Sequence, residues 1–400
     1  MKILMINVVC GIRSTGRICT DIATALDKRG HEVKIAYGRE DVPEQYKKYA
    51  VRIGNNIDVK LHGLKSRLFD RAGFGSKRAT EKFIEWVKKY DPDIIHLHNI
   101  HGYYINVEVL FNYLRTCDKK IIWSLYDCWS FTGHCAHFDY HQCSKWKIDC
   151  KNCDYITEYP KSFISSSRYN YKKKCRLFTY IPNLQLVVPS HWMKKIVEQS
   201  YMKEYPVLVM PNGIDISLFS PITSSFREKN NILPHQCMVL GVSSFWTREK
   251  GIECIIELAN RLDQSKYRIV IVGKILEGVT LPKIIIHINS TNNIKELCEI
   301  YSAADIFVNP TLQETQGLTT LEAFACGTPA VVFSSGGAAE CVNDTCGIIV
   351  ERNNITELLS IVKKIGERRI IFEKSKCIHA AKEYDIAIRN EKILQLYIVK

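Results

Sequence analysis

The segment from residue 309 to residue 329 combines two carboxylates with a helix start, and this combination suits a bound phosphate. Glu314 and Glu322 stand in an E-x7-E arrangement. The pattern predicts a buried strand over 305–309, a glycine turn, and a helix over about 318–326. Unpaired amides at 317–320 and the helix dipole would favour an anion. The segment therefore fits a sugar-nucleotide diphosphate, although an ordinary strand–helix unit with solvated glutamates fits it too.

Other polar groups follow predicted strands in both halves of the chain. Arg248 and Lys250 follow the first strand of the second half, where they could hold diphosphate oxygens or simply lie in a solvated loop. The loop 334–337 and Glu340 would lie at a neighbouring strand end, or form a plain turn. Near the start, the glycine-containing loop 11–17 would let the backbone approach a ligand. It is not G-x-G-x-x-G, so a dinucleotide site is weakly indicated.

Three histidines occur within six residues at the end of a predicted strand over 94–98. His96 and His98 point the same way along that strand, so one could be packed and the other exposed. We expect His98 to be the polar group of a site, with His101 as the second choice. The alternative is a set of satisfied structural histidines.

Sixteen cysteines are scattered over the chain without an export signal, so reduced thiols are the default expectation. Cys135, Cys143, Cys150 and Cys153 have spacing compatible with a structural zinc site of four thiolates. The segment around them offers little expected core, so a metal could supply folding energy. Reduced thiols or a disulfide remain alternatives.

Strand-like and helix-like runs alternate in both halves, which predicts parallel sheets flanked by helices. We expect an N-terminal Rossmann-like domain over 1–210, with a cysteine-rich insertion at about 126–156. A turn cluster places the hinge at 210–222. A second Rossmann-like domain would span 222–383, and a helix over 384–400 would pack back toward the first. Ligands of such sheets bind at the carboxyl ends of the strands, here in a cleft between the two domains.

The net charge of +13 is unevenly distributed along the 400 residues. Residues 161–195 hold eight Lys or Arg, no Asp or Glu, and several aromatic residues, and 60–78 is also rich in cations. Such a patch suits an anionic membrane surface or substrate, or it is a solvated helix face; no nucleic-acid module accompanies it. No apolar run is long enough to span a membrane, and the start does not resemble a signal peptide.

Taken in order, these motifs resemble the family-4 retaining glycosyltransferases of the GT-B fold, over nearly the whole chain. The elements that carry the resemblance are Ser14–Arg17, Pro92-Asp93, His96-x-His98-Asn99, Pro211–Asp215, Lys250-Gly251, Ala304-Asp305, Asn309-Pro310, Glu314 to Glu322, Ala325–Pro329, Gly336-Gly337 and Glu340. The resemblance implies two facing Rossmann-like domains with an interdomain cleft. It also implies transfer of a sugar from a nucleotide-diphosphate donor with retention of configuration.

The resemblance also assigns roles to individual residues. Glu314 would contact the hydroxyls of the donor sugar, Lys250 would neutralise the leaving diphosphate, and His98 would face the reacting centre. The donor-binding residues implied are Gly16, Arg248, Gly317, Leu318, Thr319 and Glu322, the last at the ribose. No metal or other cofactor is expected for catalysis, because cationic side chains and a helix start would stabilise the leaving group.

Two positions depart from the family pattern. Ser244 stands where an arginine is usual, so Arg248 would have to replace its phosphate contacts from another register. The run 127–135 resembles a subset of bacterial polysaccharide glycosyltransferases, but Tyr126 stands where they have histidine. Asp127, His134 and His101 are the candidates for the acceptor side.

We therefore expect a cytoplasmic enzyme peripheral to the inner face of the plasma membrane, acting in capsule, O-antigen or exopolysaccharide assembly. Its donor would be a UDP- or GDP-sugar, and its acceptor a lipid-linked saccharide. One alternative is a zinc-stabilised sugar-nucleotide-binding protein without catalysis. A second is a nucleotide-sugar epimerase, which would need no acceptor.

Overall fold

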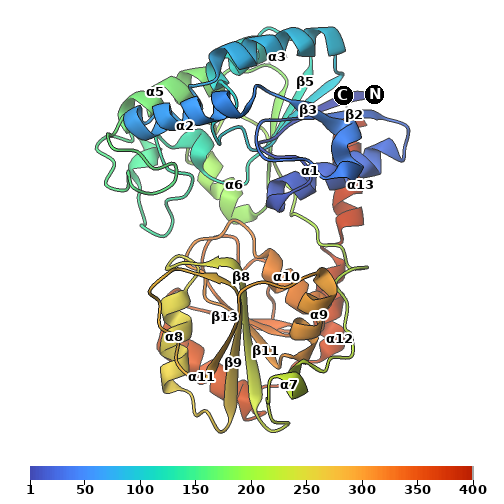
Figure 1. Cartoon of the computed structure of the whole chain (residues 1–400), viewed down its shortest axis with the longest axis vertical. Helices are drawn as coiled ribbons and strands as arrows, with labels where there is room; N and C mark the ends of the chain where they lie inside the picture. The colour runs from blue at the N-terminus through green and yellow to red at the C-terminus, as the bar shows by residue number, and fades with distance from the viewer. Residues whose placement is uncertain (399–400) are drawn as a thin grey trace. The chain divides into compact units, whose positions relative to one another are not determined.

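The computed structural model describes residues 1–398, which form two compact α/β units. One unit comprises residues 1–210 and those from 390 onward, and the other comprises 211–389. Each is built on a parallel sheet, as the alternation of strands and helices predicts (Figure 1). The predicted hinge begins at the observed boundary, whereas the last helix continues from the second unit into the first.

The first unit contains a seven-stranded sheet in the order β3-β2-β1-β4-β5-β6-β7. All its strand pairs are parallel. The central strands are buried on both faces, because their sequences are almost continuously apolar. The strands are β1 (Lys2–Ile6), β2 (Glu32–Tyr37), β3 (Ala50–Arg52), β4 (Ile94–Leu97), β5 (Lys120–Ser124), β6 (Leu184–Val188) and β7 (Val207–Val209).

Helices cover both faces of this sheet. On one face α3, α4, α5 and α6 pack into one apolar cluster, and on the other α1 and α13 pack into a second. The helices are α1 (Arg13–Asp27), α2 (Asn56–Phe69), α3 (Lys77–Tyr90), α4 (Val107–Leu114), α5 (Ser167–Phe178), α6 (His191–Glu198) and α13 (Ile386–Ile398), with short 3-10 turns η1 (Glu44–Tyr49), η2 (Trp129–Phe131) and η3 (Lys145–Lys147).

The cysteine-rich insertion contributes buried aromatic residues to the apolar cluster of the first unit, contrary to the expectation that it offers little core. Trp129, Phe131, Phe138 and Trp146 are buried, and the rings of Phe138 and Trp146 stack with centroids 4.7 Å apart. Aromatic rings bury large apolar areas, so a few of them can order a short irregular segment. The expectation of little core is therefore wrong, and with it the reason for attributing folding energy to a metal.

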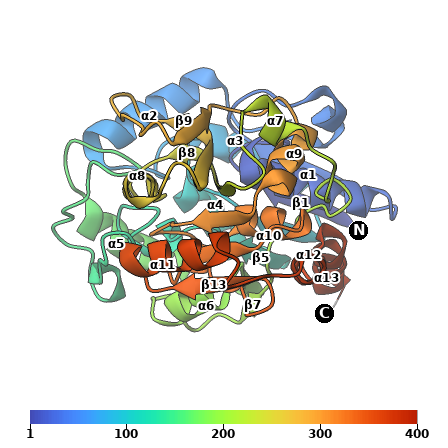
Figure 2. The same ribbon diagram turned by 90° about the horizontal axis from the view of Figure 1, so that it is seen from below.

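The second unit contains a six-stranded parallel sheet in the order β10-β9-β8-β11-β12-β13. Helices α8 and α11 pack on one face, and α9, α10 and α12 pack on the other, as Figures 1 and 2 show from two directions. The elements are β8 (Cys237–Trp246), β9 (Tyr267–Ile275), β10 (Ile285–Ile288), β11 (Ile306–Asn309), β12 (Ala330–Phe333), β13 (Gly347–Val350), α7 (Phe226–Lys229), α8 (Ile252–Arg261), α9 (Ile294–Ala303), α10 (Leu318–Ala325), α11 (Ile355–Gly366) and α12 (Lys374–Lys382).

Two element boundaries bear directly on predicted site residues. Helix α1 begins at Arg13, so Gly16 lies in its first turn and not in the preceding loop. An added Cβ on Gly16 would lie 3.2 Å from the amide nitrogen of Gly11, which shows a close approach of backbone segments. Strand β8 continues to Trp246, so Ser244 is an exposed strand residue.

Candidate active site

In the second unit, Lys250 and Glu314 come together from loops that follow two neighbouring strands. Lys250 follows β8, Glu314 follows β11, and the Lys250 ammonium forms an ion pair with the Glu314 carboxylate. Both side chains are about one third exposed, at 34% and 28%. A cation and a carboxylate at the carboxyl ends of parallel strands can hold a phosphate and sugar hydroxyls respectively.

Backbone contacts fix the two loops against each other. The amide of Leu312 donates to the carbonyl of Glu249 over 2.8 Å. Gly251 has a φ of +79°, and a Cβ there would lie 2.2 Å from the carbonyl oxygen of Pro310. This position therefore requires glycine. The Lys250–Glu314 pairing thus rests on joined backbones and not only on two flexible side chains.

The loop after β12 supports Glu314 from the other side. Gly337 donates its amide to the carbonyl of Glu314 over 2.9 Å. Gly336 has a φ of +55°, and a Cβ there would lie 2.0 Å from the same carbonyl oxygen. Gly336 and Gly337, which the sequence analysis singled out, therefore contact the Glu314 backbone and hold it in position.

The start of α10 is less open than predicted. Its N-cap is Gly317, without a capping side chain. However, the amide of Leu318 donates to the carbonyl of Gln316, and the amide of Thr320 donates to that of Gly317. The expectation that all the amides from Gly317 to Thr320 are unpaired is therefore wrong for Leu318 and Thr320. Thr319 lies in the same first turn.

Glu322 lies one to two turns into α10 and points toward α9. Its carboxylate accepts a hydrogen bond of 2.9 Å from the hydroxyl of Tyr301. Burial raises the pKa of Tyr301 well above its ordinary value, so this hydroxyl stays protonated and donates. The structure thus holds Glu322 in one orientation, while Glu314, the first carboxylate of the E-x7-E motif, pairs with Lys250.

Arg248 is not brought to this cluster. Its guanidinium pairs with Glu253 over 2.9 Å, with both side chains largely in solvent. Ser244 is also exposed, on the extended part of β8. In this structure, therefore, Arg248 does not take the place of the arginine that the family pattern has at position 244.

In the first unit, the three histidines at the end of β4 are all largely buried. His96 and His98 have exposed fractions of 0% and 1%, so the expectation that one of them is exposed is wrong. His96 bonds through Nδ1 to the hydroxyl of Tyr397 and through Nε2 to that of Ser124, over 2.6 and 2.8 Å. His98 bonds through Nδ1 to the hydroxyl of Tyr126 over 3.0 Å.

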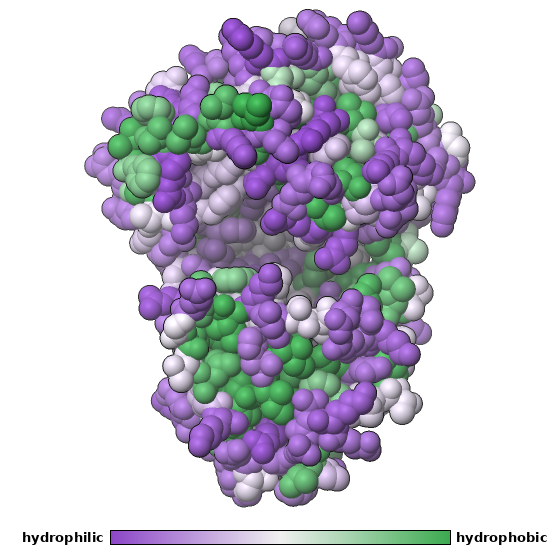
Figure 3. All heavy atoms as spheres, in the orientation of Figure 1, coloured by the Kyte–Doolittle hydropathy of each residue, from purple (hydrophilic) through white to green (hydrophobic). Residues whose placement is uncertain are grey.

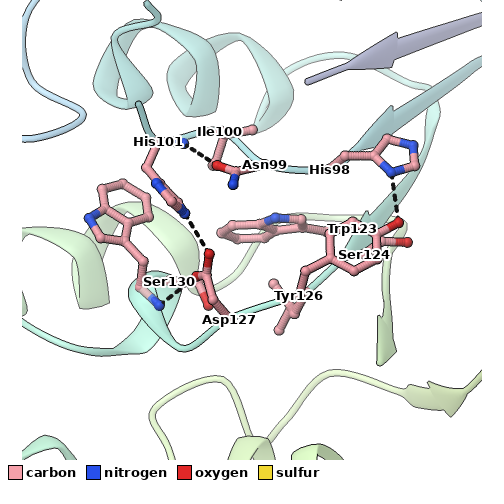
Figure 4. Close-up of a pocket in the computed structure, with 11 residues that line it drawn as sticks. His98, Asn99, Ile100, His101, Trp123, Ser124, Tyr126, Asp127 and Ser130 are labelled. Atoms are coloured by element: carbon pink, nitrogen blue, oxygen red, sulfur yellow. Dashed lines mark hydrogen bonds and ion pairs between the residues drawn. The ribbon is translucent and has the colours of Figure 1, made fainter. Parts of the chain in front are cut away.

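His101 and Asp127 form the polar end of a small cavity at the ends of β4 and β5 (Figure 4). His101 Nε2 lies 2.6 Å from a carboxylate oxygen of Asp127, and its Nδ1 lies 3.2 Å from the hydroxyl of Tyr159. Burial alone would raise the pKa of Asp127, but the charge and hydrogen bond of His101 outweigh burial and hold that pKa below its usual range. The cavity has a volume of about 10 Å³, room for about one water molecule.

His134 does not join His101 and Asp127. It is buried, and its Nδ1 lies 2.6 Å from a carboxylate oxygen of Asp70 at the end of α2. Nearby, Lys174 of α5 is fully buried, donates to the carbonyls of Trp129 and Thr132, and lies 3.6 Å from the centroid of the Trp129 ring. These contacts connect the insertion to α2 and α5. The contact of His134 with Asp70 is one of them.

The four cysteines predicted to bind zinc lie close enough to influence one another. Burial raises the pKa of the Cys150 thiol to about 12, and the neighbouring thiols of Cys143 and Cys153 contribute. Cys135 is affected in the same way by all three others. Within residues 1–398, however, no group of three or more His, Cys, Asp or Glu side chains is arranged to hold a metal ion. The structure therefore gives no support to the predicted zinc site.

Sequence reasoning missed several partners in both units. Tyr159 contacts His101 from the segment that follows the insertion, and Tyr301 contacts Glu322 from the preceding helix. Neither tyrosine belongs to a recognisable motif, and only folding brings them to their partners. Tyr126 was noted only as a departure from a pattern, yet it is the hydrogen-bond partner of His98.

Two family models match this chain, one for each half. Residues 15–218 match the model described as glycosyltransferase family 4, and residues 236–367 match that of glycosyl transferases group 1. The first match alone covers half of the chain. The chain belongs to glycosyltransferase family 4. It is a glycosyltransferase that uses a nucleotide-sugar donor, and both predicted family and predicted fold class are confirmed.

Individual relatives are distant. WcaC of Escherichia coli K12, whose name places it in colanic acid biosynthesis, is 22% identical over 91% of this chain and 90% of its own. An E. coli UDP-Gal:α-D-GlcNAc-diphosphoundecaprenol α-1,3-galactosyltransferase is 26% identical over 50% of this chain and 56% of its own. The crystal structure of Anabaena Alr3699/HepE with UDP aligns with a TM-score of 0.67 at 15% identity, over 99% of both chains.

Proposed function

We propose that this glycosyltransferase moves a sugar from a UDP-sugar to a lipid-linked saccharide diphosphate, with retention of configuration, in the biosynthesis of a surface polysaccharide. The observation that carries the proposal is the Lys250–Glu314 pair at the strand ends of the second unit. We place the reaction at the inner face of the plasma membrane, where a lipid-linked acceptor would be presented. Surface-polysaccharide assembly is supported by the likeness to WcaC.

Lys250 and Glu314 have separate tasks in this proposal. Lys250 neutralises the negative charge that develops on the departing diphosphate, and no metal is then required for that purpose. Glu314 accepts hydrogen bonds from hydroxyls of the donor sugar. Because the two side chains pair with each other, the donor has to replace this ion pair with its own contacts. Glu322, oriented by Tyr301, accepts hydrogen bonds from the ribose.

The proposed step is attack by an acceptor hydroxyl on the sugar face from which the diphosphate leaves. The new bond joins the acceptor oxygen to the anomeric carbon, while the bond from that carbon to the diphosphate oxygen breaks. The acceptor proton passes to the departing phosphate oxygen. In this scheme His98, buried beside Tyr126, lies on the acceptor side and positions the reacting groups.

The His101–Asp127 pair is the proposed polar anchor on the acceptor side. Asp127 holds His101 through the bond at Nε2, which fixes the orientation of the ring. The choice of UDP and of a lipid diphosphate is supported by two relatives, one crystallised with UDP and one named for a diphosphoundecaprenol acceptor.

The test is a transfer assay with purified protein, UDP- and GDP-sugars, and an undecaprenyl-diphosphate-linked saccharide. We expect a glycosylated lipid product from a UDP-sugar, with the anomeric configuration of the donor and with activity retained in excess EDTA. Transfer from a GDP-sugar alone would overturn the choice of nucleotide. Release of an altered sugar nucleotide without any acceptor product would favour the epimerase alternative.

A further inference from the structure

Helix α2 buries polar side chains and exposes apolar ones, which is the opposite of an ordinary surface helix. Its buried residues are the polar His62 and Ser66, whereas four large apolar side chains face solvent at a spacing of four, three and four residues. This spacing places them on one face. Their exposed fractions range from 39% to 68%, and they are Ile57, Leu61, Leu64 and Leu68.

The polar side of α2 is buried for a specific reason. His62 accepts the amides of Gly73 and Gly75 at Nε2, over 3.1 and 3.0 Å, and its Nδ1 lies 3.0 Å from the hydroxyl of Ser76. These bonds determine which face of α2 turns inward. The apolar side chains are therefore held outward by the fold and are not exposed by a loose fit.

The segment that follows the insertion extends this apolar face. The amide of Phe163 donates to the carbonyl of Arg67 over 2.8 Å, and the hydroxyl of Ser166 donates to the carbonyl of Phe69 over 3.1 Å. Phe163, Ile164 and Phe69 are themselves exposed, at 67%, 51% and 52%. We call the combined surface the α2 patch; it consists of Ile57, Leu61, Leu64, Leu68, Phe69, Phe163 and Ile164. Figure 3 shows hydrophobic residues gathered over α2.

Cations surround the α2 patch. Lys60, Lys65 and Arg67 of α2 are exposed, and the Arg67 guanidinium lies 4.7 Å from the centroid of the Phe163 ring. The one carboxylate of this helix, Asp58, is only partly exposed and is engaged in the capping box with Asn55. Lys161 and Lys172 add exposed charge from the neighbouring segment, as the run 161–195 suggested. That run is not one surface, however, because several of its members are buried, namely Tyr171, Lys174 and Phe178.

We propose that the α2 patch is the surface by which this protein docks on an anionic lipid bilayer. An exposed apolar helix face bordered by Lys and Arg is the arrangement that lies in a membrane interface, with apolar side chains among the acyl chains and cations at the headgroups. A second copy of the chain fits this surface less well, because it would bring the same positive charges face to face. Large exposed apolar patches are rare on monomeric proteins without a partner.

No helix among residues 1–398 combines the length and apolar composition needed to cross a bilayer. Docking through the α2 patch is thus contact with one leaflet. The docking proposal rests on the proposed function in one respect: the lipid-linked acceptor of that function lies at a membrane. The patch would keep the protein at the surface that presents this acceptor.

The test is cosedimentation of the full-length protein with vesicles of phosphatidylcholine alone or mixed with phosphatidylglycerol. We expect binding to the anionic vesicles, and binding that weakens as salt is raised. Leu61→Ser with Leu64→Ser should weaken binding by at least about tenfold, because two apolar side chains no longer enter the acyl region. Lys60→Gln with Lys65→Gln should weaken it on the order of tenfold and reduce the salt dependence.

The matched control is Ile371→Ser, an apolar residue of the second unit that is 77% exposed. Its binding should stay within about twofold of the parent, since isolated surface substitutions have small effects. All altered residues are exposed, and an unchanged melting temperature will show that the variants fold. Failure of the parent protein to bind anionic vesicles, or full binding by the two-leucine variant, would overturn the proposal.

Two further outcomes separate this proposal from others. A dimer that forms without lipid and is lost on Leu61→Ser with Leu64→Ser would assign the α2 patch to a second copy and overturn membrane docking. Thermal stabilisation by UDP, measured on the same samples, distinguishes failure of the docking proposal from failure of the proposed donor. Stabilisation by UDP without vesicle binding overturns only the docking surface, and vesicle binding without UDP stabilisation overturns only the donor.

Discussion

Lys250 and Glu314 form an ion pair in the second unit. Under the proposed function, donor binding has to exchange this pair for contacts to the diphosphate and the sugar. The exchange costs little, because a partly exposed ion pair contributes on the order of 1 kcal/mol or less. A similar arrangement holds Glu322, whose partner Tyr301 is neutral. At the scale of residues, the donor side is therefore already ordered by internal bonds that a ligand can replace.

Replacement of the two partners should separate binding from chemistry. Lys250→Ala should weaken UDP affinity and transfer together, because the ammonium contacts the diphosphate. Glu314→Ala should leave UDP affinity within a few-fold and lower kcat by about a hundredfold or more, because the carboxylate contacts only the sugar. Titration with UDP and steady-state kinetics measure both. Arg261→Ala, at a surface pair with Glu257, is the control; equal loss of UDP affinity in both site variants would contradict the assignment.

Lys174 gives a stability prediction with a defined sign. Burial lowers its pKa to about 7, from 10.5 for an ordinary lysine. Between these values only the unfolded state binds the proton, so the contribution of Lys174 to stability rises as pH rises. The unfolding free energy of the parent minus that of Lys174→Met should grow by about 2 kcal/mol from pH 7 to pH 9. Urea unfolding at several pH values measures it, and a constant difference would contradict the lowered pKa.

At the scale of elements, the loops after β8, β11 and β12 together form the proposed donor site. Strand β8 supplies the Lys250 loop, β11 the Glu314 loop, and β12 the glycine loop on which Glu314 rests. The three strands are adjacent in the sheet, which brings residues that lie far apart in sequence to one edge. Small residues at the loop contacts allow this close approach.

Gly336→Ala should therefore displace the Glu314 loop. The new Cβ would lie 2.0 Å from the Glu314 carbonyl oxygen, in a backbone conformation that only glycine adopts readily. We expect kcat/KM to fall by at least about tenfold, because a displacement of about 1 Å in a site can cost a hundredfold. Gly278→Ala is the matched control, since Gly278 also has a positive φ but nothing lies within 4 Å of an added Cβ. Equal activity of the two variants would refute this role of Gly336.

Much of the fold can be predicted from local sequence patterns, whereas the candidate site can be predicted only in part. Continuous apolar runs such as that of β1 predict buried parallel strands, and the structure contains them. The start of α1 was missed because Ser14, Thr15 and Gly16 read as a loop, whereas they form its first turn. The His134–Asp70 pair joins residues 64 apart, and no local spacing reveals such a contact. The roles assigned to individual site residues stay predictions.

At the scale of the whole molecule, the chain ends by returning to its first unit. Residues Ile393, Leu394 and Tyr397 of α13 are buried in a cluster with Ile3 and Met5 of β1. The Tyr397 hydroxyl also bonds to His96 at the carboxyl end of β4. The C-terminal helix thus supports the strand that leads to His98 and His101.

Tyr397→Ala should consequently destabilise the first unit. Loss of a large buried aromatic side chain costs about 3–5 kcal/mol, and His96 would lose a hydrogen-bond partner. Tyr397→Phe should cost only about 1–2 kcal/mol, because it removes the hydroxyl alone. Chemical denaturation measures both variants. A Tyr397→Ala protein as stable as the parent would contradict the docked position of α13.

The most direct test of the account is thermal stabilisation of the parent protein and of Lys250→Ala by UDP, GDP, ADP and CMP. A ligand that binds only the folded state raises stability by RT ln(1 + [L]/Kd). We predict that UDP at millimolar concentration raises Tm, that the other nucleotides do so less, and that the UDP effect is lost in Lys250→Ala. No stabilisation by any nucleotide diphosphate, or an equal UDP effect in Lys250→Ala, would contradict the assignment of the donor site.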